Sequence, residues 1–278
     1  MSKKLSDKER EHFAEHGYLF PINVFSPDEI GRYQKALEDT ERAVGPIRER
    51  EKSGKPHLLF PWANQLMREP KVLDVIEDLV GPDIFVYQVT FFSKDAHSDT
   101  FVSWHQDGTY FSLYPHEQIT AWIALSDAPI ESGCLEVLPG SQRMGQLRHV
   151  EATSKSNLLS RGQTVAEEVN SSGSVFMPLV PGQMSLHHTH MLHRSGPNTT
   201  PNRRMGLVVT YIPGRCRCVE DIRMTASLVR GEDKFKQFDP EYIPQSNLDE
   251  RGLVFHKESN RRFSILREIN AKRMQASS

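Results

Sequence analysis

Four histidines fall within seven residues of the segment GQMSLHHTHMLHRSGPN, which runs from Gly182 to Asn198. Histidine fills only 12 of the 278 positions, so this density raises the question of which of the four does chemistry. A second segment, SWHQDGTYF at 103–111, places His105 two residues before Asp107. Residues i and i+2 of a strand point to the same face, so an imidazole nitrogen and a carboxylate oxygen would converge on one point. The pair is a candidate for metal binding, and a surface pair in a loop is the alternative.

A histidine from a distant strand would complete this ligand set. Two imidazoles and one carboxylate on one face of an octahedral metal leave three positions open, which is the arrangement of non-haem Fe(II) oxygenases. The open positions suit a chelating co-substrate and O2. Eleven residues after His193 stands Arg204, and an arginine one strand further along can present a fixed cationic fork to a carboxylate. The keto acid 2-oxoglutarate, held on iron by one end, needs such a partner for its far carboxylate.

Three blocks of the chain resemble one family of such enzymes. WHQDGTYF, TAWIALSDAPIESGCLEVLPGSQ and GQMSLHHTHMLHRSGPNTTPNRR are similar to blocks of the phytanoyl-CoA dioxygenase family of Fe(II)/2-oxoglutarate oxygenases. The resemblance spans roughly residues 10–215, and the order, spacing and strand context of the blocks agree. It implies a mainly β fold with flanking helices around a double-stranded β-helix, the jelly-roll or cupin-like core.

The resemblance also implies roles for individual residues. His105, Asp107 and His193 would hold Fe(II), and Arg204 with Ser195 would bind the far carboxylate of 2-oxoglutarate. Other side chains expected near the co-substrate are Trp122, Gln88, Thr90, Lys55 and His57, and those expected to contact the substrate are Asn157, Gln163 and Tyr110. For Trp122, Gln88 and Thr90, the alternative is that these side chains only pack in the core. For Asn157 and Gln163, the alternative is that they lie in a solvated loop.

Neighbouring residues of the same types receive other expectations. His188 would pack near the site or stand behind its ligands, whereas His187 and His190 would line the pocket or lie in a loop. Arg203 would face away from the side on which Arg204 lies, because adjacent strand residues alternate.

The reaction that the resemblance implies consumes O2 and 2-oxoglutarate, yields succinate and CO2, and hydroxylates an unactivated C–H bond. Halogenases of similar pattern have a small residue in place of the carboxylate, so Asp107 favours hydroxylation, desaturation or ring closure. We expect a small polar substrate of amino-acid, aminophosphonate or natural-product type, and the arginines that could rim the barrel mouth are Arg143, Arg148, Arg161, Arg215 and Arg217. A cupin-like metalloenzyme that does not use 2-oxoglutarate and a non-catalytic jelly-roll binding protein stay open as alternatives.

Surrounding elements must position these residues. The first third reads as helical, with Ser26-Pro27-Asp28-Glu29 as a capping box before a helix to about Val44. Short β-branched and aromatic runs separated by turn residues then predict a sandwich or jelly roll, at 84–92, 119–127, 134–139, 174–180, 183–188 and 204–212. The polar stretch 141–173 is a possible lid, and the charged tail 213–278 is expected to pack around the outside. One domain over 1–278 is the simplest division.

Composition narrows the class of protein. Basic residues number 34 and acidic residues 36, and this balance argues against partners such as nucleic acid or a membrane surface. Three cysteines are too few for a disulfide framework. No apolar run reaches membrane-spanning length, and neither a signal peptide nor a peroxisomal address is evident. We therefore expect a cytoplasmic protein acting on a small molecule, and the sequence indicates no oligomeric state.

Overall fold

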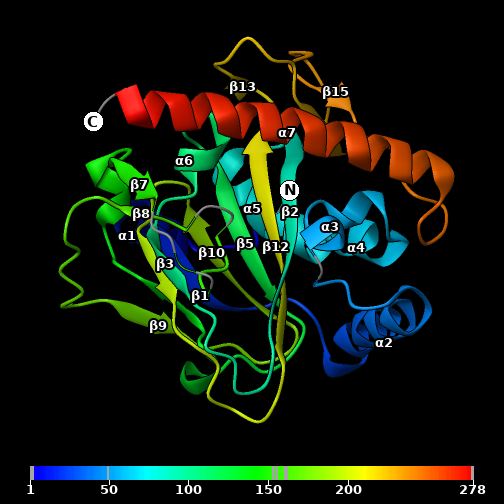
Figure 1. The fold of residues 1–278 in the computed structure, drawn as a ribbon, viewed down its shortest axis with the longest axis horizontal. Helices are drawn as coiled ribbons and strands as arrows, with labels where there is room; N and C mark the ends of the chain where they lie inside the picture. The colour runs from blue at the N-terminus through cyan, green and yellow to red at the C-terminus, as the bar shows by residue number, and fades with distance from the viewer. Residues whose placement is uncertain (1–2, 49, 152–153, 155, 160–161, 277–278) are drawn as a thin grey trace.

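The computed structural model describes residues 3–48, 50–151, 154, 156–159 and 162–276. Two sheets form its centre (Figure 1). The larger has the strand order β1 (Tyr18–Asn23), β10 (Gln183–His188), β5 (Ile119–Ala124), β12 (Arg204–Pro213), β2 (Ile84–Lys94), β14 (Thr225–Arg230), β15 (Asp239–Pro240). The smaller has the order β3 (Val102–His105), β11 (His193–Ser195), β6 (Leu135–Val137), β9 (Val175–Met177). Two short pairs join β13 (Arg217–Cys218) to β4 (Leu113–Tyr114) and β7 (His149–Glu151) to β8 (Gln163–Val165).

The chain passes repeatedly between the two large sheets. β2 lies in the larger sheet and β3 in the smaller one, and the same exchange follows from β5 to β6 and from β10 to β11 before β12 returns. Neighbouring strands are antiparallel except for β14 and β15. This winding is that of a jelly roll whose sheets do not close on each other, and it confirms the predicted fold class.

The two faces of the larger sheet differ in polarity. On β2, Val89 belongs to the main hydrophobic core, whereas Gln88 and Thr90 line a pocket on the opposite face. The alternation is the period-two pattern of a strand. The alternation is interrupted next to Gln88, because the pairing of β2 with β12 shifts by one residue there: Thr210 pairs with Gln88, but Tyr211 pairs with Val86. The polar side chains between the sheets therefore follow from strand geometry.

Helices of the first third cover the outer face of this sheet. The helices are α1 (Asp7–His16), α2 (Pro27–Val44), α3 (Arg50–Ser53), η1 (Pro56–Leu58), α4 (Pro61–Leu66) and α5 (Pro70–Val80). Ser26 accepts from the Glu29 amide while the Glu29 carboxylate accepts from the Ser26 amide, so the predicted capping box is confirmed. Ile30 and Leu37 of α2 enter the core together with Val72 and Ile76 of α5. Shorter helices further along the chain are α6 (Gly108–Phe111), η2 (Ile130–Ser132) and η3 (Ser141–Met144).

The charged tail has a larger role than the sequence suggested. It ends in one long helix, α7 (Glu250–Ala276), which runs across the ends of the central strands (Figure 1). Phe263 and Leu266 of α7 are buried against Tyr87 and Phe238 in a second hydrophobic cluster. The tail therefore does not only wrap the outside, because one side of α7 faces the interior. Among the described residues, no helix is both long and apolar enough to cross a membrane.

Strand predictions succeeded where the runs were apolar. Each of the six predicted runs contains an observed strand, and the strands outside these runs include β1, β3, β11 and β14. β3 and β11 are short and carry polar or charged side chains, so they lack the hydrophobic pattern on which the prediction depended. The possible lid at 141–173 contains η3, β7 and β8, and its residues 152, 153, 155, 160 and 161, Arg161 among them, lie outside the described residues.

Candidate active site

Three predicted ligands meet between the two sheets. His193 at the start of β11 stands opposite His105 at the end of β3 in the antiparallel register. Asp107 does not lie in the strand as the i, i+2 argument assumed, because β3 ends at His105 and Asp107 has helical backbone angles before α6. The turn still carries its carboxylate to the two imidazoles. One ligand atom from each of the three residues lies within 4.8 Å of the others.

Backbone carbonyls fix the orientation of both imidazoles. Nδ1 of His105 is 2.9 Å from the Ser103 carbonyl oxygen, and Nδ1 of His193 is 2.9 Å from that of Met191. A proton on each Nδ1 donates to these oxygens, which leaves the Nε2 lone pairs facing Asp107. The two Nε2 atoms lie 3.6 and 3.7 Å from Asp107 Oδ1. Such a set presents two neutral nitrogens and an oxygen to one point.

Electrostatics favours the protonation states that a metal requires. Burial holds the pKa of His193 well below its usual value, and the nearby His105 and His187 add to the effect. Burial alone would raise the pKa of Asp107, but the surrounding His193, His105 and His187 hold it well below its usual range. Metal ligands must be neutral imidazoles and ionised carboxylates. The donor set therefore fits a divalent cation such as Fe(II).

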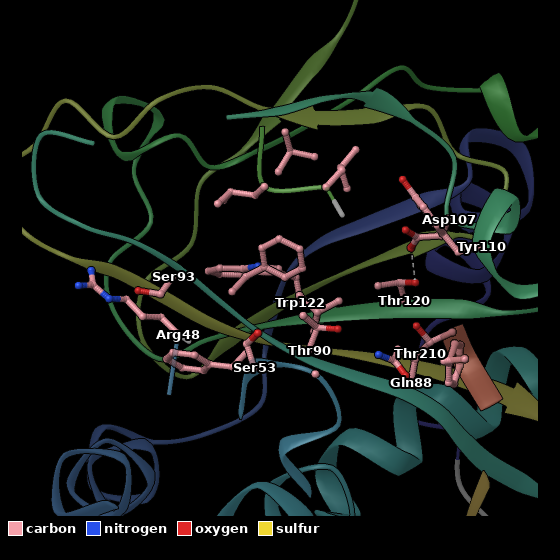
Figure 2. Close-up of a pocket in the computed structure, with 18 of the residues that line it drawn as sticks. Arg48, Ser53, Gln88, Thr90, Ser93, Asp107, Tyr110, Thr120, Trp122 and Thr210 are labelled. Carbon is pink, nitrogen blue, oxygen red and sulfur yellow. Dashed lines mark hydrogen bonds between the residues drawn. The ribbon is translucent and has the colours of Figure 1, made fainter. Parts of the chain in front are cut away.

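A third histidine, His187, supports the carboxylate. Asp107 Oδ2 accepts a 2.7 Å hydrogen bond from Thr120 Oγ1, dashed in Figure 2, and lies 3.2 Å from His187 Nε2. His187 lines the pocket as expected, whereas the expectation that His188 packs near the site was wrong. His187 pairs with Thr120 in the register and faces the site, whereas His188 faces away and bonds the His116 carbonyl. The alternation along β10 decides this, and its phase was not visible in the sequence.

Arg204 lies in the same pocket as these ligands, at the start of β12. It is buried, and its Nε has no hydrogen-bond partner among the described residues. Its guanidinium stacks over Trp122, with Cζ 4.7 Å from the ring centre. The ring occupies space that only a glycine leaves open, because a Cβ on Gly206 would lie 2.2 Å from Trp122 Cζ2. Burial lowers the pKa of Arg204 to about 10, so it remains a cation at neutral pH.

A buried lysine stands beside this arginine and was not predicted. Lys94 at the end of β2 pairs with Arg204 in the register. Its Nζ donates to Ser195 Oγ at 2.7 Å and to the Gly196 carbonyl. Burial and the charge of Arg204 lower its pKa to about 6. The sequence held a signal for Lys94, because it lies an even number of residues from Gln88 and Thr90 on the same strand. Those two residues were expected to point inward, so Lys94 should point the same way.

Most of the predicted co-substrate and substrate residues line one pocket of about 1850 Å³. Those in the lining are Gln88, Thr90, Trp122, Ser195, Arg204, Tyr110 and Asn157. In Figure 2, Gln88, Thr90, Thr120 and Thr210 project from the larger sheet, with Asp107 and Tyr110 at one end and Arg48 and Ser93 at the other.

The two predicted amides contact other residues around this pocket. The Nδ2 of Asn157 donates to Ser103 Oγ at 2.9 Å. Gln163 is not part of the lining, but its Oε1 accepts from the Tyr110 hydroxyl at 3.3 Å. Arg203 pairs with Glu41 on the other side of the sheet, as alternation predicted.

Two predicted residues lie elsewhere. Lys55 and His57 are completely buried and do not line the pocket. Both contact Glu241, with His57 Nε2 2.8 Å from Oε2 and the Lys55 ammonium on Oε1. Burial would raise the pKa of Glu241, but the charges of Lys55 and His57 hold it well below its usual range. The expectation for this segment failed because the C-terminal tail supplies a counter-ion that local sequence does not reveal.

The arginines expected at the mouth of the barrel also lie elsewhere. Arg143 donates to the Glu15 carbonyl and Arg215 pairs with Glu117. Arg217 lies on β13, and none of the described members of this set lines the pocket. Basic residues of the lining come instead from other segments, chiefly α7 and the chain around α3.

The fold and this arrangement of side chains are those of a non-haem iron dioxygenase of the 2-oxoglutarate-dependent class. Comparison with known proteins supports this assignment to the 2-oxoglutarate-dependent class. The family described as phytanoyl-CoA dioxygenase (PhyH) matches residues 13–206, and the chain belongs to this family.

Individual relatives and solved structures are also similar to this chain. A probable alpha-ketoglutarate-dependent hypophosphite dioxygenase of Stutzerimonas stutzeri is 28% identical, covering 74% of this chain and 78% of the relative. L-proline trans-4-hydroxylase of Streptomyces griseoviridis is 28% identical, covering 53% and 61%. The apo non-heme monooxygenase ThoJ superposes with a TM-score of 0.84 at 29% identity, covering 95% of this chain and 99% of ThoJ. CytC3 with Fe(II) and alpha-ketoglutarate, at 22% identity and a TM-score of 0.62 over 88% of this chain and all of CytC3, shares the fold.

Proposed function

We propose that this chain binds Fe(II) through His105, Asp107 and His193 and hydroxylates an unactivated C–H bond of a small polar metabolite. 2-Oxoglutarate would be the co-substrate, with its far carboxylate on Arg204 and Ser195. The observation that carries the proposal is the buried Arg204, whose Nε lacks a partner among the described residues, in the same pocket as the three ligands. A buried guanidinium without a counter-ion is unfavourable unless a ligand supplies the anion.

The bound iron, with 2-oxoglutarate and O2, supplies an oxidant that removes hydrogen from a C–H bond, with succinate and CO2 as the other products. The chain contributes position and exclusion of water. Thr120 and His187 fix Oδ2 of Asp107 and leave Oδ1 for the metal. The stack of Arg204 on Trp122 aims the guanidinium before the co-substrate arrives.

Relatives and pocket chemistry support a polar substrate. The two curated relatives above are named for hypophosphite and L-proline, both small and polar. Uncharged polar groups line the pocket beside the proposed metal site, including Gln88, Thr90 and Thr210. A substrate that offers hydrogen-bonding groups would satisfy these side chains, whereas a purely aliphatic one would leave them unpaired.

Succinate production by anaerobically Fe(II)-loaded protein, given 2-oxoglutarate and then air, tests the proposal. Turnover uncoupled from a substrate makes the assay independent of knowing it. We expect succinate from the wild type, none from His193→Ala, and recovery of Arg204→Met only at much higher 2-oxoglutarate. Arg203→Met is the matched control, because this neighbour pairs with Glu41 outside the pocket.

Each negative outcome points to a different class of protein. Metal binding that depends on His193 without any succinate would indicate a metalloenzyme that does not use 2-oxoglutarate. No metal binding at all, measured with Fe(II) or Mn(II) by calorimetry, would indicate a non-catalytic jelly roll.

A further inference from the structure

One side of α7 forms a wall of the pocket. The residues of this wall are Leu253, His256, Lys257, Asn260, Phe263 and Arg267. Apart from the adjacent His256 and Lys257, they recur every three or four positions, so they form one stripe along the helix. With a rise of about 1.5 Å per residue, the stripe is roughly 21 Å long. It lies beyond residues 13–206, the region that matches the family.

The stripe differs from an ordinary buried helix face, because most of its members are polar. Phe263 anchors the helix in the second hydrophobic cluster, whereas Lys257 and Asn260 present polar groups to the pocket. His256 Nε2 lies 2.8 Å from the Gly54 carbonyl and ties α7 to the segment after α3. Polar side chains facing a large cavity are typical of a ligand-binding wall.

Positive charge dominates this part of the pocket. Lys52, Lys257 and Arg267 line it, whereas the acidic side chains among the described lining residues are Asp107 and Glu151. Asp107 belongs to the proposed metal site. Lys257 is exposed and forms no ion pair with a described residue. Other cations of the lining have partners within the protein: Arg48 pairs with Asp95, Arg194 pairs with Glu136, and Lys52 donates to the Val44 carbonyl oxygen at 2.8 Å.

The pocket has room for a substrate besides the co-substrate. Its volume of about 1850 Å³ exceeds the roughly 300–1,000 Å³ of ordinary small-molecule sites. Gly54, beside the wall, forms a bridge with Thr90, and the other end of α7 contacts α6, next to Asp107 and Tyr110. A molecule lying along α7 would therefore extend from the Lys257 region toward the proposed metal site.

We propose that the α7 wall is the substrate subsite and that it binds an anionic group, a carboxylate or a phosphate-like group, of the metabolite. The subsite rests on the proposed function for its meaning as a substrate site. Its basic side chains concentrate anions in the groove. Lys257 fixes one end of the substrate so that a C–H bond at the other end faces the ligand triad. The subsite sets specificity within the family, because it is built from residues outside the matching region.

Labelling of lysines by pyridoxal 5′-phosphate tests the subsite without turnover. Its aldehyde condenses with a lysine amine to an imine with loss of water, borohydride reduces the imine, and peptide mass spectrometry locates the label. Lys272 is the control, because it is an exposed lysine of α7 that does not line the pocket. Pyridoxal, which lacks the phosphate, is the matched uncharged probe.

We expect Lys257 to be labelled at least about tenfold faster than Lys272 by the phosphate probe, as focusing of anions in a charged cleft predicts. Pyridoxal should show no such preference, and inorganic phosphate should remove it. Equal rates for the two lysines, or an equal preference with pyridoxal, would overturn the proposal.

The succinate assay distinguishes failure of the anion subsite from failure of the proposed function. Succinate production without selective labelling would mean that the substrate is not anionic. Selective labelling without succinate would mean an anion site in a protein with another activity.

Discussion

Two buried lysines, Lys55 and Lys94, have opposite electrostatic surroundings. Lys55 contacts Glu241, which also accepts a hydrogen bond from His57. Lys94 faces Ser195 and the Gly196 carbonyl and stands opposite Arg204. Within the described part of the chain, no carboxylate pairs with Lys94. The first lysine belongs to a compensated cluster, whereas the second stands beside the cation Arg204 and has no anion next to it.

The difference separates structural from ligand-binding charge. Removing one partner of a buried ion pair costs about 3–5 kcal/mol, because the other charge is left alone. Lys94 and Arg204 have no such anion among the described residues, and the charge of Arg204 adds to burial in lowering the pKa of Lys94. A dianion such as 2-oxoglutarate would supply the missing anion. The comparison teaches that a buried cation is a candidate binding group when its counter-ion is missing, and structural when the fold supplies one.

The largest expected effect is on the compensated cluster. Glu241→Gln leaves Lys55 and His57 without their anion, so we expect the free energy of unfolding to fall by about 3–5 kcal/mol. Urea unfolding followed by circular dichroism measures it, with Glu232→Gln as the control at an exposed position. A loss below about 1 kcal/mol would contradict the structural role of the cluster. The affinity of the folded fraction for 2-oxoglutarate should stay unchanged.

Arg204→Met should act in the opposite way. We expect the affinity for 2-oxoglutarate to fall about 100-fold, or roughly 2.7 kcal/mol, while stability stays the same or rises. Anaerobic calorimetry on Mn(II)-loaded protein gives the affinity, and thermal unfolding gives the stability. Arg203→Met should bind 2-oxoglutarate normally. A variant at 204 that unfolds more easily but binds as well as wild type would make this arginine structural.

Lys94→Met should produce a smaller change of the same kind. Lys94 acts through Ser195, whose hydroxyl it holds by a 2.7 Å hydrogen bond, so we expect about a tenfold loss of 2-oxoglutarate affinity. Metal affinity should not change, because Lys94 is not among the three proposed ligands. Both constants come from the same calorimetric titrations. An unaltered 2-oxoglutarate affinity would show that Arg204 alone carries the charge.

The smallest expected effect is a dependence on pH. Lys94 has a pKa of about 6 in the free protein, so it is mostly neutral above that pH. A bound dianion favours the ammonium form and raises the pKa, so binding above pH 6 takes up a proton. The affinity should therefore weaken as pH rises from 6 to 8, by less than tenfold per pH unit for one proton. Titrations in buffers of different ionisation enthalpy count the proton, and Lys94→Met should abolish the uptake.

The sequence determined the chemistry of the centre of this protein. The H-x-D pair, His193 before its Ser-Gly-Pro-Asn turn and Arg204 eleven residues later were all recognisable, because residue types and spacing along the chain carry that information. The jelly roll was equally predictable from apolar runs of strand length. The location of Asp107 outside β3 did not matter, since the turn brings its carboxylate to the same point.

Tertiary structure decided the features that depend on strand phase or on distant partners. Which of His187 and His188 faces the site follows from how β10 aligns with β5, and a shift of one residue would exchange them. Lys55 became structural and Lys94 a candidate binding group because Glu241, far along the chain, meets only the first. The wall of α7 arises because Phe263 and Leu266 pack on Tyr87 and turn the polar stripe toward the pocket. Local sequence specifies side chains and periodicity, whereas burial and counter-ions are properties of the folded whole.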